Sequence, residues 1–453
     1  VKAAIGTPAS PNTSIVDNTS SGALYTIFSD VTTVTSNVTQ SLNAASGWGG
    51  SSYTGTRSAA PFAILDVIYE GQKMIMTADN AVVFPALNVN WSVNNKPLAA
   101  GQTQNLVTGD LGGSFYNPDD KGLYILGAEN ADTDEYDSAV IGHEWGHFFE
   151  SNFSRSDSNG GEHANGDILH PSVAFGEGFG TAFGAMILNN PLYIDSSGAG
   201  QSSVAVETNL ENNDVPIKTV KLGTGSISIE FDGYYSENSV MEVIYDIFDG
   251  GATDDDALAL GFTPMYQVLV GGQKNTKAFT SIFTFLYHLK IAAPSSSAAI
   301  NAIALAENID LSDNNEFQDA IDPSDLAPQY SGITPDGTVF SLDSEFKTLQ
   351  TFNNFGAVAA DDVGNKLLNQ RFFATTILTA GCYTLTVTPT TASDIYIQFP
   401  SNKTPTEVDK FTLAETFIKT YTAGEILTYS VGAFAPNVPF TVKVESTPSV
   451  PGC

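Results

Sequence analysis

The chain contains 453 residues, and 42% of them are hydrophobic, which is enough for two or three domains with buried cores. Its 50 acidic and 18 basic residues give a net charge of −32, and this charge argues against nucleic acid or an anionic membrane as a partner. We expect no membrane span, because no apolar run reaches the roughly 18 residues that a spanning helix requires.

A lobe built on a β-sheet is predicted for residues 1–135. Residues 1–57 are polar and rich in Ser, Thr, Asn and Gly, which is typical of an extended start to the chain. Residues 58–80 predict a helix that backs the sheet, residues 81–93 predict a strand, and residues 112–127 predict a strand pair around a turn. The apolar side of the predicted helix consists of Phe62, Leu65, Ile68 and Tyr69.

An acidic segment, AENADTDEYD, follows this strand pair. Its carboxylates could supply the oxygen ligands that calcium prefers, although they lack the spacing of an EF-hand loop. The alternative is a solvated acidic loop that ends in a helix cap. The four candidate calcium ligands are Asp132, Asp134, Glu135 and Asp137.

Residues 137–150, DSAVIGHEWGHFFE, predict a helix that carries a metal site. His143 and His147 are four residues apart, so both imidazoles lie on one face of the helix and can bind one metal ion. Zinc favours nitrogen ligands and keeps a water molecule in a catalytic site. Glu144 faces the open side of the ion and can take a proton from that water, which predicts it as the catalytic base.

A second helix, predicted for residues 173–186, is expected to supply the third metal ligand, Glu177. Glycines recur in it at four-residue steps, and each costs roughly 1 kcal/mol in a helix interior. The row therefore predicts that another backbone, that of the metal-binding helix, lies close by. The alternative is an ordinary helix pair with a solvated Glu177. The row consists of Gly176, Gly180 and Gly184.

The polar residues 151–170 connect the two predicted helices and indicate a wall of the active-site cleft. His163 and His170 lie in this connection. Either histidine could bind the metal in place of Glu177, donate a hydrogen bond to substrate, or lie at the surface.

The motif HEWGH, followed by GEGFGTAF, resembles the gluzincin metallopeptidases, nearest in pattern to the fungalysin-like and thermolysin-like groups. The resemblance covers about residues 137–187. It implies a zincin-like fold of two lobes, one with a mixed sheet and one helical. It also implies Glu144 as the base, a protein or peptide as the substrate, and three zinc ligands: His143, His147 and Glu177.

The resemblance assigns roles outside the two motifs as well. Thr181 stands where these groups usually place an aspartate that orients a zinc-binding histidine, so an uncharged hydroxyl replaces a charge. Gluzincins also place a hydrogen-bond donor at the start of a later helix, facing the zinc. Tyr234 or Tyr235 could supply this donor and stabilise the oxyanion, with plain packing as the alternative.

An edge strand that precedes the zinc helix binds the substrate backbone in gluzincins. The strand pair at residues 112–127 arrives just before the predicted zinc helix, so the resemblance places this role on its first strand. A plain hairpin is the alternative. The residues concerned are Gly113, Ser114, Phe115 and Tyr116.

Helical patterns continue to the end of the predicted domain 136–330, including a helix in residues 233–249 that Ser236 caps. Residues 331–350 lose this pattern and are predicted to be a linker. Residues 351–453 show short strands between turns, which predicts an antiparallel β-sandwich. This tail loosely resembles the bacterial pre-peptidase C-terminal domain through AGCYTLTVTP and SDIYIQF. Such a module could contact a glycan or a cell surface, or only stabilise the enzyme.

The two cysteines, Cys382 and Cys453, lack metal-type spacing. One cysteine pair in an acidic chain rich in Ser, Thr and Asn fits an exported protein with one disulfide, and two reduced buried thiols are the alternative. Val1 is not a start methionine, so we expect a mature or trimmed product of a secreted, extracellular or periplasmic protein.

Together these observations predict an α+β fold in which a zincin-like two-lobe metallopeptidase precedes a β-sandwich. The predicted function is that of a secreted zinc-dependent endopeptidase. Two other functions stay open. One is a surface or binding protein that retains a zinc site without turnover, and the other is a zinc hydrolase of a non-peptide amide or ester.

Overall fold

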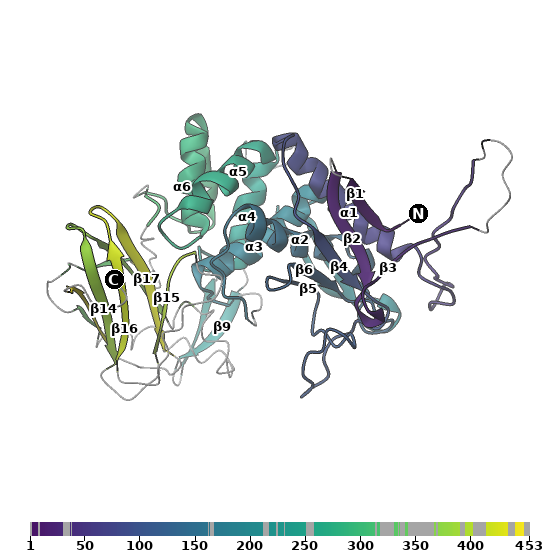
Figure 1. The fold of residues 1–453 in the computed structure, drawn as a ribbon, viewed down its shortest axis with the longest axis horizontal. Helices are drawn as coiled ribbons and strands as arrows, with labels where there is room; N and C mark the ends of the chain where they lie inside the picture. Colours follow the sequence, from purple (N-terminus) through teal and green to yellow (C-terminus); the bar gives the residue numbers. More distant parts are fainter. Residues whose placement is uncertain are drawn as a thin grey trace. The chain divides into compact units, whose positions relative to one another are not determined.

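A computed structural model provides the structure of the chain (Figure 1). It mixes helices with strands, which confirms the α+β class. Contacts divide the chain into two compact units, one of Val1–Phe153, Phe179–Asn212 and Leu260–Tyr266 and one of Ser154–Gly178, Asn213–Ala259 and Gln267–Cys453. The structure describes residues 2–7, 10–29, 37, 39–161, 163, 167–211, 217–222, 225–230, 232–250, 258–312, 315–317, 330–333, 335, 340–342, 367, 370–389, 395–401, 414–433 and 440–447.

A mixed six-stranded sheet forms the centre of the first unit, in the order β1-β2-β4-β6-β5 with β3 paired to β2. The pairs β2–β4 and β4–β6 are parallel, whereas β1–β2, β2–β3 and β5–β6 are antiparallel. The predicted strand pair is therefore a hairpin at the edge of the sheet. The strands are β1 (Ala4–Thr7), β2 (Ser10–Asp17), β3 (Ala23–Leu24), β4 (Leu87–Trp91), β5 (Phe115–Asn117) and β6 (Gly122–Ile125).

Helix α1 (Ala60–Ala78) packs against this sheet, where Gln72 donates a hydrogen bond to the Thr13 hydroxyl at 3.0 Å. The predicted helix is confirmed, but its predicted apolar side is wrong in part. Tyr69 is 43% exposed, and the buried face instead includes Gly71. A Cβ at Gly71 would lie 2.4 Å from the Trp145 ring, so the buried face is turned toward the helix that carries that tryptophan.

Helices α2 (Ser138–Phe153) and α3 (Pro171–Leu188) correspond to the two helices predicted to carry the metal ligands. Their backbones approach closely, because a Cβ on Gly142 would lie 2.7 Å from the Gly184 Cα, and one on Gly146 would lie 2.9 Å from the Gly180 Cα. This contact confirms the prediction drawn from the glycine row for Gly180 and Gly184. The glycines of each helix leave the space that the backbone of the other helix occupies.

An antiparallel hairpin follows α3 and consists of β7 (Leu192–Ser197) and β8 (Ser203–Asn209). It returns to the segment that precedes α2, where an isolated bridge pairs Asp132 with Ser197. The Gly198 N–H also donates to the Ala131 carbonyl at 2.8 Å. The chain that leaves α3 is thus tied to the chain that enters α2.

Helix α4 (Glu237–Phe248) begins at its predicted cap, Ser236, whose side chain accepts a hydrogen bond from the Ser239 N–H. The helical region continues with α5 (Phe262–Val268), the π-helical segment η4 (Leu269–Gln273), α6 (Ile282–Ala292), η5 (Pro294–Ser296) and α7 (Ser297–Ala306). Short 3-10 turns elsewhere are η1 (Asn18–Ser20), η2 (Asp134–Tyr136) and η3 (Ala199–Gln201), and strands β9 (Ile217–Leu222) and β10 (Gly225–Glu230) pair antiparallel.

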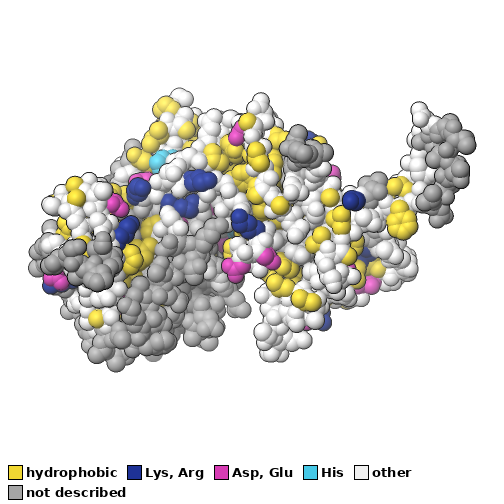
Figure 2. Space-filling model, viewed as in Figure 1, with side chains coloured by type: hydrophobic (Ala, Val, Ile, Leu, Met, Phe, Trp, Pro, Cys, Tyr) yellow, Lys and Arg dark blue, Asp and Glu magenta, His cyan; other side chains and the backbone are white. Residues whose placement is uncertain are grey.

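Within the described ranges, no single helix has both the length and the hydropathy of a membrane span, although the bent pair Ile282–Ala292 and Pro294–Ala306, at 114°, meets these criteria when taken together. Figure 2 shows charged side chains scattered among hydrophobic and uncharged ones on the face viewed.

Two four-stranded sheets lie near the end of the chain, in the orders β11-β13-β17-β15 and β12-β18-β14-β16. Their buried residues form one hydrophobic cluster, as in a two-sheet sandwich. Every pair is antiparallel except β11–β13. The strands are β11 (Ser331–Gly332), β12 (Phe340–Leu342), β13 (Gln370–Thr376), β14 (Gly381–Pro389), β15 (Ile395–Gln398), β16 (Glu415–Tyr421), β17 (Ile426–Ala433) and β18 (Phe440–Ser446).

Strands β11 and β12 lie within residues 331–350, which were predicted to be a linker, so part of that stretch belongs to the sheets. Cys382 lies in β14, whereas Cys453 lies outside the described residues. The disulfide between them stays a prediction.

Candidate metal centre

His143 and His147 bring two imidazole nitrogens together on one face of α2, as their spacing predicts. Their Nε2 atoms lie 3.0 Å apart, and the two rings are nearly perpendicular at 86°. Tetrahedral zinc with Zn–N bonds of about 2.0–2.1 Å holds two ligating nitrogens roughly 3.3 Å apart. The observed separation is close to this value, so the pair is nearly positioned for one metal ion.

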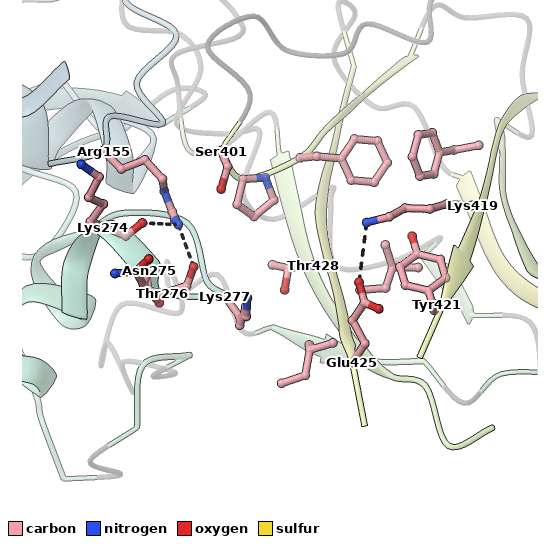
Figure 3. A pocket seen from close by; sticks show the side chains of 15 residues that line it. Arg155, Lys274, Asn275, Thr276, Lys277, Ser401, Lys419, Tyr421, Glu425 and Thr428 are labelled. Carbon is pink, nitrogen blue, oxygen red and sulfur yellow. Dashed lines mark hydrogen bonds and ion pairs between the residues drawn. The ribbon is translucent and has the colours of Figure 1, made fainter. Parts of the chain in front are cut away.

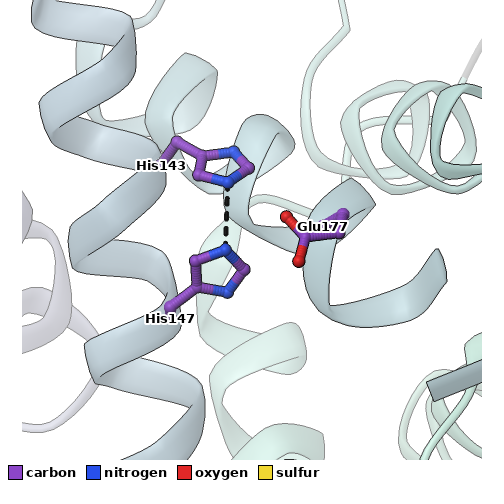
Figure 4. A group of neighbouring side chains, drawn as sticks. All are labelled: His143, His147 and Glu177. Atoms are coloured by element: carbon purple, nitrogen blue, oxygen red, sulfur yellow. Dashed lines mark hydrogen bonds between the residues drawn. The ribbon is translucent and has the colours of Figure 1, made fainter. Parts of the chain in front are cut away.

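Glu177 completes the group from α3 (Figure 4). One ligand atom from each of His143, His147 and Glu177 lies within 4.8 Å of the others, and the Glu177 carboxylate points toward the imidazoles. Glu177 is 9% exposed, whereas both histidines are half-buried. Two nitrogens and one carboxylate oxygen are a donor set that suits zinc.

Thr181 follows Glu177 by one helical turn and meets the first histidine. Its Oγ1 lies 2.9 Å from the Nδ1 of His143. The hydroxyl therefore occupies the position expected for the group that orients a metal-binding imidazole, and it does so without a charge. Glycine at position 180 permits this approach, because a Cβ there would lie 3.1 Å from the same Nδ1 atom.

Glu144, the predicted catalytic base, follows His143 on α2 and is 7% exposed. Its role as a general base stays a prediction.

The two other histidines near the group do not join it. His163 lies 3.4 Å from Glu177 and 3.5 Å from Glu237, measured from its Nε2 to a carboxylate oxygen. Burial lowers the pKa of His163, but the two carboxylates outweigh this effect and raise it to about 10. His170 is fully buried against Phe279. The structure thus groups Glu177, rather than His163 or His170, with the histidine pair.

Tyr234 and Tyr235 precede α4 and are 1% and 4% exposed. The Tyr235 hydroxyl donates to the Asp232 carbonyl at 3.2 Å, and the Tyr234 ring packs on Phe283 at a centroid distance of 5.1 Å. These contacts do not test the oxyanion role, which stays a prediction. A third tyrosine, Tyr193 on β7, was not singled out from the sequence, and its ring lies 6.4 Å from that of His143.

Two of the four residues predicted to form the substrate strand, Phe115 and Tyr116, lie in β5 at the edge of the sheet, whereas Gly113 and Ser114 precede this strand. Phe115 stacks on Tyr124 of β6, and Tyr116 packs against Phe148 of α2. Ser114 turns inward, where it donates to the carboxylate of Asp134 and accepts from the Leu126 N–H. A Cβ added at Gly113 would have no atom within 4 Å beyond the neighbouring residues.

A second group of possible metal ligands differs from the predicted calcium ligands in one member. Glu135 is not part of it, because its carboxylate binds Arg57 at 2.6 Å and the Trp91 indole at 3.2 Å. Asp195 of β7 takes its place. The observed group consists of Asp132, Asp134, Asp137 and Asp195.

A cavity of about 550 Å³ lies in the second unit, and no residue of either group lines it (Figure 3). Arg155 on its wall pairs with Asp157 at 2.8 Å, and Lys419 lies 3.6 Å from Glu425. Four of the chain's 18 basic residues line this cavity: Arg155, Lys274, Lys277 and Lys419. Nothing here shows a glycan or cell-surface contact, which stays a prediction.

No family model and no curated protein sequence matches this chain. Any inference about function therefore rests on the residues of the site. The fold and the site define a protein with a candidate His-His-Glu metal centre held between two tightly packed helices.

Proposed function

We propose that the protein is a secreted zinc-dependent endopeptidase of the gluzincin type, with a zincin-like catalytic part that acts on proteins or peptides. One observation carries the proposal. His143, His147 and Glu177 offer ligand atoms within 4.8 Å of one another, and Glu144 adjoins the first of them on the same helix. A purely structural zinc site is usually closed by four protein ligands, whereas three ligands leave a position for water.

The residues have distinct roles in this reaction. Zinc, when bound, supplies Lewis-acid chemistry that polarises the scissile carbonyl and lowers the pKa of a water molecule. Glu144 accepts the proton of the attacking water and later passes it to the leaving amine nitrogen. Thr181 holds the His143 ring so that its Nε2 faces the metal position.

Substrate binding is proposed for the outer edge of β5, which pairs on its inner side with β6. A peptide in an extended conformation could add there as a further antiparallel or parallel strand. Tyr235 or Tyr234 remains the proposed donor to the oxyanion, and a phenylalanine at each position would show which hydroxyl contributes.

The decisive experiment measures zinc content and peptide cleavage for Glu144→Gln. Removing a general base lowers the rate by ~10²–10⁴-fold, while zinc content and the circular dichroism spectrum should stay unchanged. Glu70→Gln, on the exposed face of α1, is the matched control and should cleave at the wild-type rate. Wild-type activity in Glu144→Gln would refute the mechanism.

Two other outcomes distinguish the competing functions. Zinc binding without cleavage of any peptide in a mixed library would favour a binding or surface protein. Cleavage of activated esters or small amides, with no cleavage of peptides, would favour a hydrolase of non-peptide substrates.

A further inference from the structure

Four aspartates meet in the first unit, and none of them belongs to the His143, His147 and Glu177 group. Asp132 lies in the loop before α2, Asp134 in η2, Asp137 directly before α2, and Asp195 in β7. One carboxylate oxygen from each lies within 4.8 Å of the others. The group therefore joins segments that are about 60 residues apart in the sequence, which distinguishes it from an acidic run on a solvated loop.

The most buried member has an oxygen with no hydrogen-bond partner. Asp134 is 3% exposed, and its Oδ2 accepts a hydrogen bond from the Ser114 hydroxyl. Its Oδ1 is buried without a partner, and the same holds for one oxygen each of Asp132 and Asp195. An unpartnered carboxylate oxygen is costly to bury, and three in one place indicate that something positive belongs among them.

The described part of the protein does not supply that positive charge. Among the described residues, no ion pair with Lys, Arg or His involves any of the four aspartates. Arg57 pairs with Glu135, which follows Asp134 in the sequence but lies outside the group. The mutual repulsion of the carboxylates is therefore not compensated within the described structure.

We propose that Asp132, Asp134, Asp137 and Asp195 bind one calcium ion. An all-oxygen donor set selects a hard cation over zinc. Calcium accepts six to eight oxygens in flexible geometry, whereas magnesium keeps most of its water and demands a strict octahedron. Four carboxylates at one site therefore fit calcium better than magnesium.

The ion would stabilise the contact between β7 and the start of α2, the helix that carries the histidine pair. Tyr193 and Asp195 are two residues apart on β7, so their side chains lie on the same face of the strand. The Tyr193 ring contacts that of His143 at a centroid distance of 6.4 Å. Calcium on Asp195 and Asp137 would hold β7 against the start of α2 and keep Tyr193 in place beside His143.

The test uses the zinc-loaded full chain in calcium-depleted buffer, titrated with Ca²⁺ by calorimetry and with Tb³⁺ by sensitised luminescence. One Ca²⁺ should bind per chain and raise the melting temperature in a concentration-dependent manner. Asp195→Asn should weaken Ca²⁺ binding at least ~10-fold. Asp66→Asn, which removes an exposed carboxylate on α1, should bind Ca²⁺ as the wild type does.

The difference in melting temperature between Asp195→Asn and the wild type should change sign when calcium is added, which tests the proposal even if the variant differs in stability. Without calcium, Asp195→Asn should melt at or above the wild-type temperature, because one repelling charge is gone. With saturating calcium, it should melt below the wild type. Failure of the wild type to bind Ca²⁺ at millimolar concentration, or equal binding by Asp195→Asn, would overturn the proposal. The result does not depend on peptidase activity, since Glu144→Gln protein should bind Ca²⁺ equally well.

Discussion

The Nδ1 atom of His143 lies 2.9 Å from the Oγ1 atom of Thr181. A neutral imidazole carries one N–H group, so a donor at Nδ1 leaves the lone pair of Nε2 free for a metal. That Nε2 atom faces the Nε2 of His147 at 3.0 Å. In the tautomer with the proton on Nδ1, the Thr181 hydroxyl accepts the hydrogen bond, and the His143 Nε2 is left to bind a metal ion.

Replacing Thr181 by valine tests this role, because valine has nearly the same shape and cannot hydrogen-bond. Zinc affinity of Thr181→Val should fall by ~10–100-fold, the usual effect of losing a group that orients a metal ligand. Competition with a chromogenic chelator measures the change. Thr181→Ser keeps the hydroxyl and should stay close to the wild type, whereas equal affinity in all three proteins would show that the contact is incidental.

Glu177 should be required for zinc binding, because it is the carboxylate that lies with the histidine pair. Elemental analysis of Glu177→Ala after dialysis should show a clear loss of zinc. His163→Ala removes a side chain that contacts Glu177 but lies outside the group, so this variant should retain most of its zinc. If the two variants behave in the opposite way, the third ligand is His163.

The close packing of α2 and α3 should tolerate no added methyl group at Gly142. A Cβ there would lie 2.7 Å from the Gly184 Cα, and backbone cannot move aside as a flexible side chain can. Gly142→Ala should lower the free energy of unfolding by ~1–3 kcal/mol, as overpacked cores do. Gly271→Ala is the control, since no atom lies within 4 Å of its added Cβ. Equal denaturant midpoints for the two variants would contradict the close contact.

His170 should make the fold sensitive to acid. Complete burial lowers the pKa of His170 from 6.5 to about 3 in the folded chain. Between these values the unfolded state binds more protons, so the free energy of unfolding falls as the pH decreases, by up to about 1.4 kcal/mol per pH unit. The Nδ1 of His170 accepts a hydrogen bond from the Ser172 N–H, which an asparagine oxygen can replace.

His170→Asn should therefore show a shallower loss of stability than the wild type between pH 6.5 and pH 3, in denaturant titrations at several pH values. Carboxylates that titrate in the same range affect both proteins equally, so the difference between the two slopes isolates the histidine. Identical slopes would mean that His170 becomes protonated without unfolding the protein.

Features that depend on local spacing were predictable from the sequence alone. The four-residue step places His143 and His147 on one helix face in any α-helix, and Ser236 caps α4 because a short polar side chain satisfies free N–H groups at a helix start. The glycine row predicted the close helix pair, since mid-helix glycine is unfavourable unless another backbone needs the space.

Contacts between distant segments were decided only by the tertiary structure. The sequence placed Glu135 among the calcium candidates, but Arg57 binds it, and Asp195 joins the group through the hairpin that follows α3. The buried face of α1 likewise depends on where Trp145 packs. The sequence alone determined which side chains share a helix face, because backbone geometry repeats every few residues. Only the fold decided which carboxylate, histidine or tyrosine lies beside another, because those distances depend on packing between segments far apart in the chain.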